Sequence, residues 1–184
     1  MSQSWNGFLM EEFEFEDMPA LVVHPEKSNG RLAIKMEYWD AFPNTEIALL
    51  KEGFYLCYIK NETRFAIDND VDRKARFICY VAEKFGLKPS VVPVGMSCGG
   101  LWAIKFAARH PDLISCLYLD APVLNYMSWP CGFGTGTAGI NDKQVDYIKK
   151  DNIVYGGTRL DQLFAHNKNG DSGLKADRQS HGRF

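Results

Sequence analysis

From residue 32 onward, short apolar runs alternate with longer amphipathic stretches along the chain. The apolar runs are rich in β-branched, aliphatic and aromatic residues, which is typical of buried strands. They cover residues 32–38, 54–59, 91–94 and 114–119. The stretches between them predict helices over residues 44–53, 70–85 and 101–110. Because strands that alternate with helices form a mainly parallel sheet with helices on both faces, we expect an α/β fold.

The two ends of the chain differ from this middle part. Short apolar segments on either side of the turn-forming residues 17–19 predict an N-terminal β-hairpin. At the other end, the apolar periodicity weakens after residue 141, and hardly any apolar residues follow His166. We therefore predict one domain over residues 1–155 and a poorly structured tail over residues 156–184.

The composition is that of an ordinary globular protein. With 184 residues, of which 46% are hydrophobic and 13% aromatic, the chain is long and apolar enough for one domain with a core. The formal net charge is −2 and charges of both signs are interspersed, so we expect no binding to nucleic acid or to an anionic membrane. The N-terminus is acidic, and no run approaches the about 18 apolar residues of a membrane span, which predicts a cytoplasmic protein.

No spacing of residues predicts a metal ion or a cofactor. The five cysteines are odd in number and lack CxxC spacing, which favours a reduced protein. The sequence contains no HExxH motif. Residues 134–139 spell GxGxxG, but Trp129-Pro130-Cys131 precedes them where a dinucleotide site needs a strand, so we interpret this segment as a loop.

The predicted strand 91–94 is joined to the next predicted helix by the run Gly95-Met96-Ser97-Cys98-Gly99-Gly100. A sharp strand-to-helix turn strains its middle residue and requires small neighbours, which the glycines provide. Such a turn exposes the serine Oγ and presents the next backbone N–H to a developing oxyanion. The run therefore predicts a nucleophile elbow centred on Ser97. The alternative is a glycine-rich turn that contains an incidental serine.

On these residues, the middle of the chain resembles the α/β-hydrolase superfamily. The segment 92–101 carries most of the resemblance, and 106–113 and 117–123 look like the helix end and the strand that follow the nucleophile. The resemblance covers about residues 13 to 135. In such enzymes the serine attacks an acyl carbonyl, a histidine takes its proton, an acid orients the histidine, and two N–H groups hold the oxyanion.

The resemblance implies roles for particular residues. Ser97 stands at the nucleophile position and Cys98 at the position of the first oxyanion donor. The second donor falls near Tyr38 or Trp39, in the loop after the strand 32–38, although the usual glycine-rich motif is missing there.

For the catalytic acid and base, the resemblance offers candidates whose positions match the superfamily less closely than that of Ser97. Asp120 occupies an acid position used by some lipases of the superfamily, with a turn-forming or capping role as the alternative. His166 has the chain order expected of the base, with an exposed surface histidine as the alternative. His24 and His110 precede prolines at the ends of predicted elements, where we expect structural roles, and His181 lies in the polar tail.

The sequence thus predicts a serine hydrolase that acts on a small-molecule ester or related acyl bond. The aromatic segment 126–133 is a candidate wall for an acyl pocket. The loss of apolar periodicity suggests that the fold lacks its C-terminal third, through truncation or a frame change from about Gly156. An open sheet edge would then favour association with a second copy. The alternative from another class is a catalytically inactive binding or scaffold protein.

Overall fold

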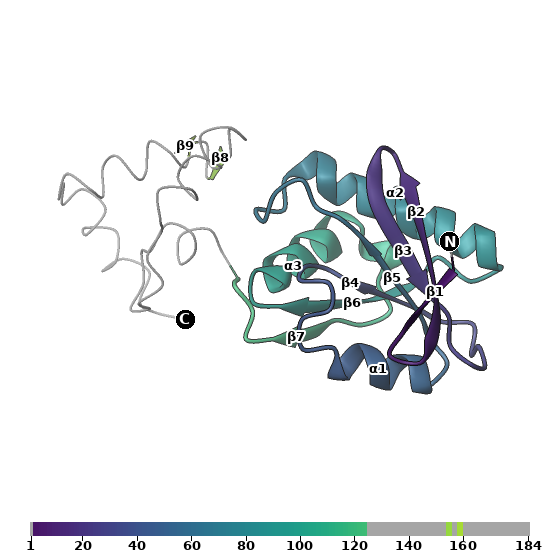
Figure 1. Ribbon diagram of the computed structural model, residues 1–184. Coiled ribbons are helices and arrows are strands. Elements are labelled where there is room, and N and C mark those ends of the chain that lie inside the picture. The colour runs from purple at the N-terminus through teal and green to yellow at the C-terminus, as the bar shows by residue number, and fades with distance from the viewer. Residues whose placement is uncertain (1, 125–153, 156–157, 160–184) are drawn as a thin grey trace. The chain divides into compact units, whose positions relative to one another are not determined.

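The computed structural model describes residues 2–124, 154–155 and 158–159 (Figure 1). The chain divides into one unit that ends at Leu124 and a second that begins at Asn125. In the second unit, β8 (Val154–Tyr155) and β9 (Thr158–Arg159) pair in an antiparallel sheet. Several predictions concern residues outside the described ones, namely the tail boundary at residue 156, the segments 126–133 and 134–139, and the histidines His166 and His181.

The first unit is built on a seven-stranded sheet with the order β1-β2-β3-β5-β4-β6-β7. Its strands are β1 (Ser2–Trp5), β2 (Phe8–Phe15), β3 (Met18–Val23), β4 (Leu32–Lys35), β5 (Tyr55–Ile59), β6 (Val91–Met96) and β7 (Tyr118–Asp120). The strands that follow residue 32 pair in parallel, as predicted. The predicted hairpin of β2 and β3, together with β1, extends the sheet in antiparallel pairing.

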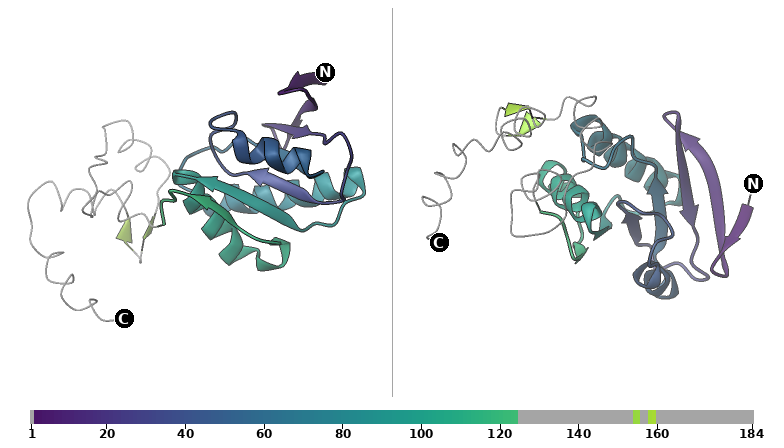
Figure 2. Two further views of the ribbon diagram at one scale, coloured as in Figure 1. Left: turned by 90° about the horizontal axis from the view of Figure 1, so that it is seen from below. Right: turned by 60° about the vertical axis from the view of Figure 1, so that its left-hand side comes forward.

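Helices cover both faces of this sheet (Figures 1 and 2). They are α1 (Asn44–Lys51), α2 (Asp68–Phe85), α3 (Cys98–Arg109) and the short 3-10 helix η1 (Pro111–Leu113). Figure 2 shows α1 on one face, with α2 and α3 on the other. This arrangement confirms the α/β fold predicted from the alternating pattern. Within the described residues, no helix combines the length and apolar character needed to cross a membrane.

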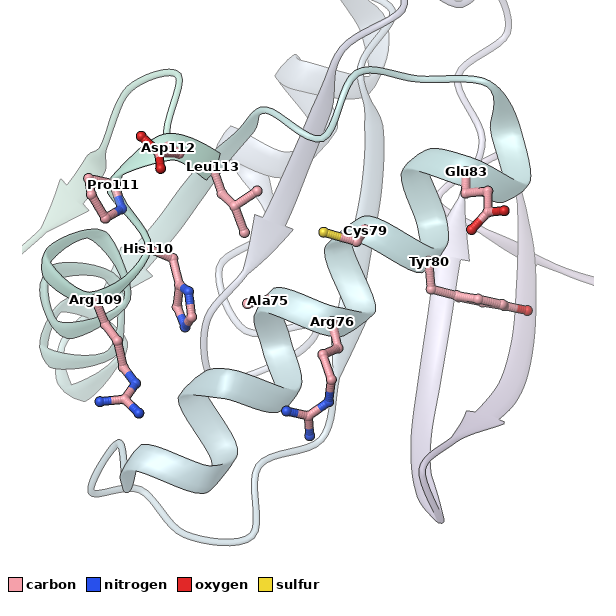
Figure 3. Close-up of a pocket in the computed structure, with 10 residues that line it drawn as sticks. All are labelled: Ala75, Arg76, Cys79, Tyr80, Glu83, Arg109, His110, Pro111, Asp112 and Leu113. Atoms are coloured by element: carbon pink, nitrogen blue, oxygen red, sulfur yellow. The ribbon is translucent and has the colours of Figure 1, made fainter.

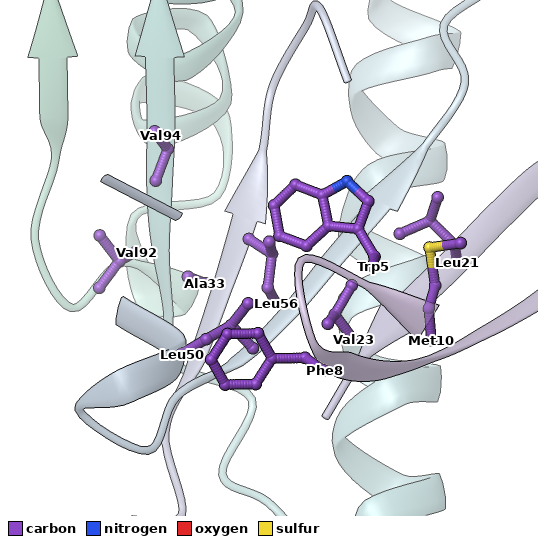
Figure 4. Close-up of a cluster of buried hydrophobic side chains, with 10 residues drawn as sticks. All are labelled: Trp5, Phe8, Met10, Leu21, Val23, Ala33, Leu50, Leu56, Val92 and Val94. Atoms are coloured by element: carbon purple, nitrogen blue, oxygen red, sulfur yellow. The ribbon is translucent and has the colours of Figure 1, made fainter. Parts of the chain in front are cut away.

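The sheet face beneath α1 holds a cluster of buried apolar side chains (Figure 4). They are Trp5, Phe8, Met10, Leu21, Val23, Ala33, Leu50, Leu56, Val92 and Val94. The central strand β4 is buried along its whole length because helices lie on both of its faces. Since side chains alternate along a strand, Ala33 joins this cluster while Leu32 and Ile34 lie on the opposite face.

Some boundaries differ from the sequence predictions. The strand predicted over 32–38 ends at Lys35, because Tyr38, Asp40 and Phe42 have φ values of 56°, 60° and 49°, which no strand accommodates. The strand predicted over 114–119 is reduced to β7, with Ile114 forming only an isolated bridge. The loop that replaces the end of the first strand contributes to the candidate site.

Candidate active site

The turn between β6 and α3 has the geometry of a nucleophile elbow. Ser97 is its middle residue, with φ 53° and ψ −121°, a conformation that is costly for any residue other than glycine. Main-chain hydrogen bonds hold it there. The Ser97 N–H donates to the carbonyl oxygen of Asp120 at 3.0 Å, and its own carbonyl oxygen accepts from the N–H groups of Gly100 at 2.9 Å and Val123 at 2.8 Å. Hydrogen bonds with α3, with the end of β7 and with the segment that follows it therefore stabilise the strained backbone of Ser97.

The glycines of the elbow are needed for close packing. A Cβ atom on Gly95 would lie 2.6 Å from the carbonyl oxygen of Gly99, and one on Gly100 would lie 2.3 Å from Cβ of Pro122. On Gly99 the added atom would be 3.3 Å from Cβ of Glu37. A side chain at Gly95 or Gly100 would thus push α3 away from its neighbours, and the turn would open.

Tyr38 approaches the elbow from the loop between β4 and α1. Its hydroxyl oxygen accepts a hydrogen bond from the Cys98 thiol at 3.3 Å. Burial raises the pKa of Tyr38 to about 12, while interaction with the Ser97 hydroxyl and the charge of Arg64 oppose the rise. The phenol is therefore protonated at neutral pH and lies beside both Ser97 and Cys98.

The other residue considered for this loop, Trp39, turns away from the elbow. Its ring lies 4.9 Å from the ring of Trp5 and 5.6 Å from that of Tyr58, and it packs against the cluster beneath α1. Trp39 therefore contributes to the apolar core through its side chain. Of the two candidates, only Tyr38 has a side chain in contact with the elbow.

The thiol of Cys98 is poorly suited to act as a nucleophile. Cys98 is buried, and this burial raises the pKa of its thiol to about 11. The thiol thus remains protonated at neutral pH and acts as the donor to Tyr38. The Cys98 N–H lies in the first turn of α3, where backbone N–H groups have no partner within the helix.

The proposed acid is placed at the elbow by its main chain. Asp120 pairs with Met96 across β6 and β7, and its carbonyl oxygen accepts from Ser97. Its side chain is exposed at the edge of the sheet. Among the described residues, no side chain forms a hydrogen bond with the Asp120 carboxylate, so its catalytic role remains a prediction.

The two described histidines pair with acids on other elements. His24 contacts Glu11 of β2 at 2.9 Å, and His110 contacts Asp72 of α2 at 2.9 Å. These contacts are in keeping with the structural roles expected for both. The base predicted from chain order, His166, lies outside the described residues.

Two further residues beside Tyr38 had no signal in the sequence. Arg64, on the loop between β5 and α2, holds its guanidinium carbon 5.1 Å from the centroid of the Tyr38 ring. Asn61, on the same loop, donates to the carboxylate of Glu37 and to the carbonyl oxygen of Met36. Loop residues of this kind follow no periodicity, and only the fold brings them to the site.

The described residues also contain a cavity of about 600 Å³ away from the elbow, between α2 and the end of α3 (Figure 3). The two arginines that line it are each paired with an acid. Arg109 forms two hydrogen bonds with Asp72, and Arg76 forms two with Glu16. Within the described part of the chain, no group of acids, histidines and cysteines is arranged to hold a metal ion.

Comparison with known proteins connects this geometry to a fold. No family model and no curated protein matches the chain. A solved structure of a putative esterase from Staphylococcus aureus matches with a TM-score of 0.52 and 16% identity, over 89% of this chain and 57% of that one. An epoxide hydrolase from Vigna radiata matches with a TM-score of 0.49 and 13% identity, over 64% and 39%.

A metagenomic enzyme described as an alpha/beta hydrolase matches with a TM-score of 0.44 and 15% identity, over 61% of this chain and 52% of that one. The chain thus spans between 39% and 57% of the length of these three solved structures. The strand order, the elbow and the likeness to the staphylococcal structure lead to one conclusion: the chain has the fold of the α/β-hydrolase superfamily.

Proposed function

We propose that the protein is a serine hydrolase that cleaves an ester or related acyl bond of a small molecule, with Ser97 as the nucleophile. The observation that carries the proposal is the backbone of Ser97, with φ 53° and ψ −121° at the junction of β6 and α3. Strain of this kind persists where the surrounding structure maintains it, and it often serves function. In a nucleophile elbow such a backbone aims the serine Oγ out of the sheet edge, where an acyl carbonyl can approach.

The oxyanion formed by attack on the carbonyl is stabilised in this proposal by two donors. One is the N–H of Cys98 at the start of α3, where the helix dipole also favours negative charge. The other is the phenol hydroxyl of Tyr38, whose pKa of about 12 keeps the proton in place. This second donor is a side chain, in place of the backbone N–H expected near Tyr38 or Trp39.

Proton transfer from Ser97 requires a base, because a serine hydroxyl alone is a poor nucleophile. We assign this role to His166 on its chain order and the role of acid to Asp120 on its position after β7. The histidine would take the proton from Oγ and return it to the leaving group, while the acid would orient the ring.

A second candidate function is a binding or scaffold role without catalysis. The observation that favours it is the apolar surface around β7, where Leu117, Tyr118 and Leu119 are 40%, 42% and 36% exposed. In the described part of the chain, β7 pairs with β6 alone, so its other edge offers unpaired main-chain groups. Such an edge favours pairing with another chain, including a second copy of this one.

Hydrolysis of a short-chain p-nitrophenyl ester by the folded protein tests the catalytic proposal. Ser97→Ala should abolish activity, and a fluorophosphonate reagent should label Ser97 in the wild-type chain. Ser90→Ala is a matched control, since Ser90 lies just before the other end of β6 and should be dispensable. Loss of activity in His166→Ala would support the base. A folded wild type that neither hydrolyses the ester nor takes up the reagent would favour the binding role.

A further inference from the structure

Arg64 is an exposed cation on a loop that is anchored beside the candidate active site. Two residues after it, Ala66 is fully buried, and its carbonyl oxygen accepts a hydrogen bond from Lys105 of α3 at 2.7 Å. On the other side of Arg64, Asn61 donates to the carbonyl oxygen of Met36 at 2.9 Å. The loop is therefore tied to α3 after Arg64 and, through the Asn61 side chain, to the end of β4 and the segment that follows it before Arg64.

The side chain of Arg64 extends over the ring of Tyr38, with its guanidinium carbon 5.1 Å from the ring centroid. Tyr38 in turn accepts from Cys98, the residue next to Ser97. The charge of Arg64 also opposes the rise in pKa of both Tyr38 and Cys98, which agrees with its position close to the elbow. A guanidinium that rests on an aromatic ring keeps its N–H edge free to bind a planar anion.

The charge of Arg64 lacks a partner among the described residues, where no carboxylate lies within ion-pair distance of it. Three other arginines of the fold are paired with acids at 2.5–2.7 Å, namely Arg73, Arg76 and Arg109. Glu37, which precedes Tyr38, is occupied by the amide of Asn61. A free cation beside a nucleophile attracts substrates that carry a negative group.

We infer that Arg64 binds a carboxylate on the substrate, so that the preferred substrates are esters with a carboxylate near the reacting carbonyl. This inference rests on the proposed hydrolase function. The guanidinium can donate two parallel N–H bonds to a carboxylate, which would also orient the acyl group over Ser97. Because Arg64 is exposed, we expect the pair to contribute about tenfold to kcat/KM, less than a buried pair would.

Two esters of similar length test the inference in the full chain, monoethyl succinate and ethyl butyrate, with acid release followed by pH-stat titration. We expect the ratio of kcat/KM for monoethyl succinate to kcat/KM for ethyl butyrate to fall about tenfold in Arg64→Met and to recover in part in Arg64→Lys. Arg31→Met is the matched control. Arg31 also lies over an aromatic ring, 5.8 Å from the centroid of Phe54, but it precedes β4 at the opposite end of the strand. That variant should keep the wild-type ratio.

The outcomes separate the inference from the proposed function. A ratio that is unchanged in Arg64→Met overturns the inference and leaves the hydrolase function intact. If the folded protein hydrolyses neither ester, the hydrolase function fails, and calorimetric titration with succinate then tests Arg64 alone. Succinate binding that is lost in Arg64→Met supports the anion site, and absence of binding to the wild type overturns it.

Discussion

Replacing Lys74 by methionine should remove a rise in stability between about pH 8 and pH 10.5. Lys74 lies on α2 and is 1% exposed. Its Nζ donates to the carbonyl oxygen of Ile59 at 3.1 Å and lies 5.1 Å from the centroid of the Trp102 ring. Burial lowers the pKa of Lys74 from 10.5 to about 8. The charged and titratable groups that face it are Glu37, Asp70, Cys57, Arg73 and Tyr58.

The sign of the effect follows from the two pKa values. The folded-state pKa lies below that of the unfolded chain, so the unfolded chain binds more protons between about pH 8 and pH 10.5, and stability rises with pH there. Below this window Lys74 is charged in both states, and the fold bears the full cost of burying the charge. At about 1.4 kcal/mol per pH unit, this cost is about 3 kcal/mol. The methionine variant is free of it but loses the hydrogen bond to Ile59.

Urea denaturation of wild type and Lys74→Met, from about pH 7 to pH 10, measures this difference. The free energy of unfolding of the wild type should gain about 2 kcal/mol relative to the variant over that range, since other groups titrate in both proteins. Lys88→Met is the control, because Lys88 is exposed and has no ion pair among the described residues. Parallel pH profiles for wild type and Lys74→Met would refute this account of the buried charge.

Other substitutions probe the elbow, the loop between β4 and α1, and a buried ion pair. Gly100→Ala should destabilise the fold by about 1–3 kcal/mol, because the new Cβ would overlap Pro122. The rate of ester hydrolysis and the Tm should both decrease. Tyr38→Phe should lower kcat about 100-fold with an unchanged circular dichroism spectrum, and an unchanged kcat would exclude the phenol as a donor. Lys35→Met leaves Glu46, which is 2% exposed, without its partner and should cost about 3–5 kcal/mol in urea denaturation, whereas Lys35→Met combined with Glu46→Leu should restore much of that loss.

The sequence was sufficient to predict the parallel part of the sheet, because continuous apolar runs and periodic helices specify such layers strongly. The N-terminal strand escaped prediction for the opposite reason. Residues 2–5 are mostly polar, so they carry no apolar pattern of a strand, although they pair with β2 in the fold. The strand predicted from residue 114 was too long, since the apolar run continues where pairing with β6 does not.

The sharp turn at Ser97 could be predicted because one short run of residues, with its glycines, specifies it. The choice between Tyr38 and Trp39 could not be made from sequence, because both are aromatic residues of the same loop. The positive φ of Tyr38 turns the chain so that the two side chains lie on different sides of the loop, and this φ value is known only from the structure. Arg64 could not be singled out from the sequence, because a lone arginine forms no pattern. Only the fold shows that it lies over the ring of Tyr38.

The hydrogen bonds that join Ser97 to Asp120 and Val123 have a consequence for the order of folding. The elbow is the meeting point of two chain segments more than twenty residues apart, and the strained serine gains support from the later one. During synthesis, the central strands can assemble before that segment leaves the ribosome. The strained backbone of Ser97 should therefore take its final conformation late, after most of the core has formed.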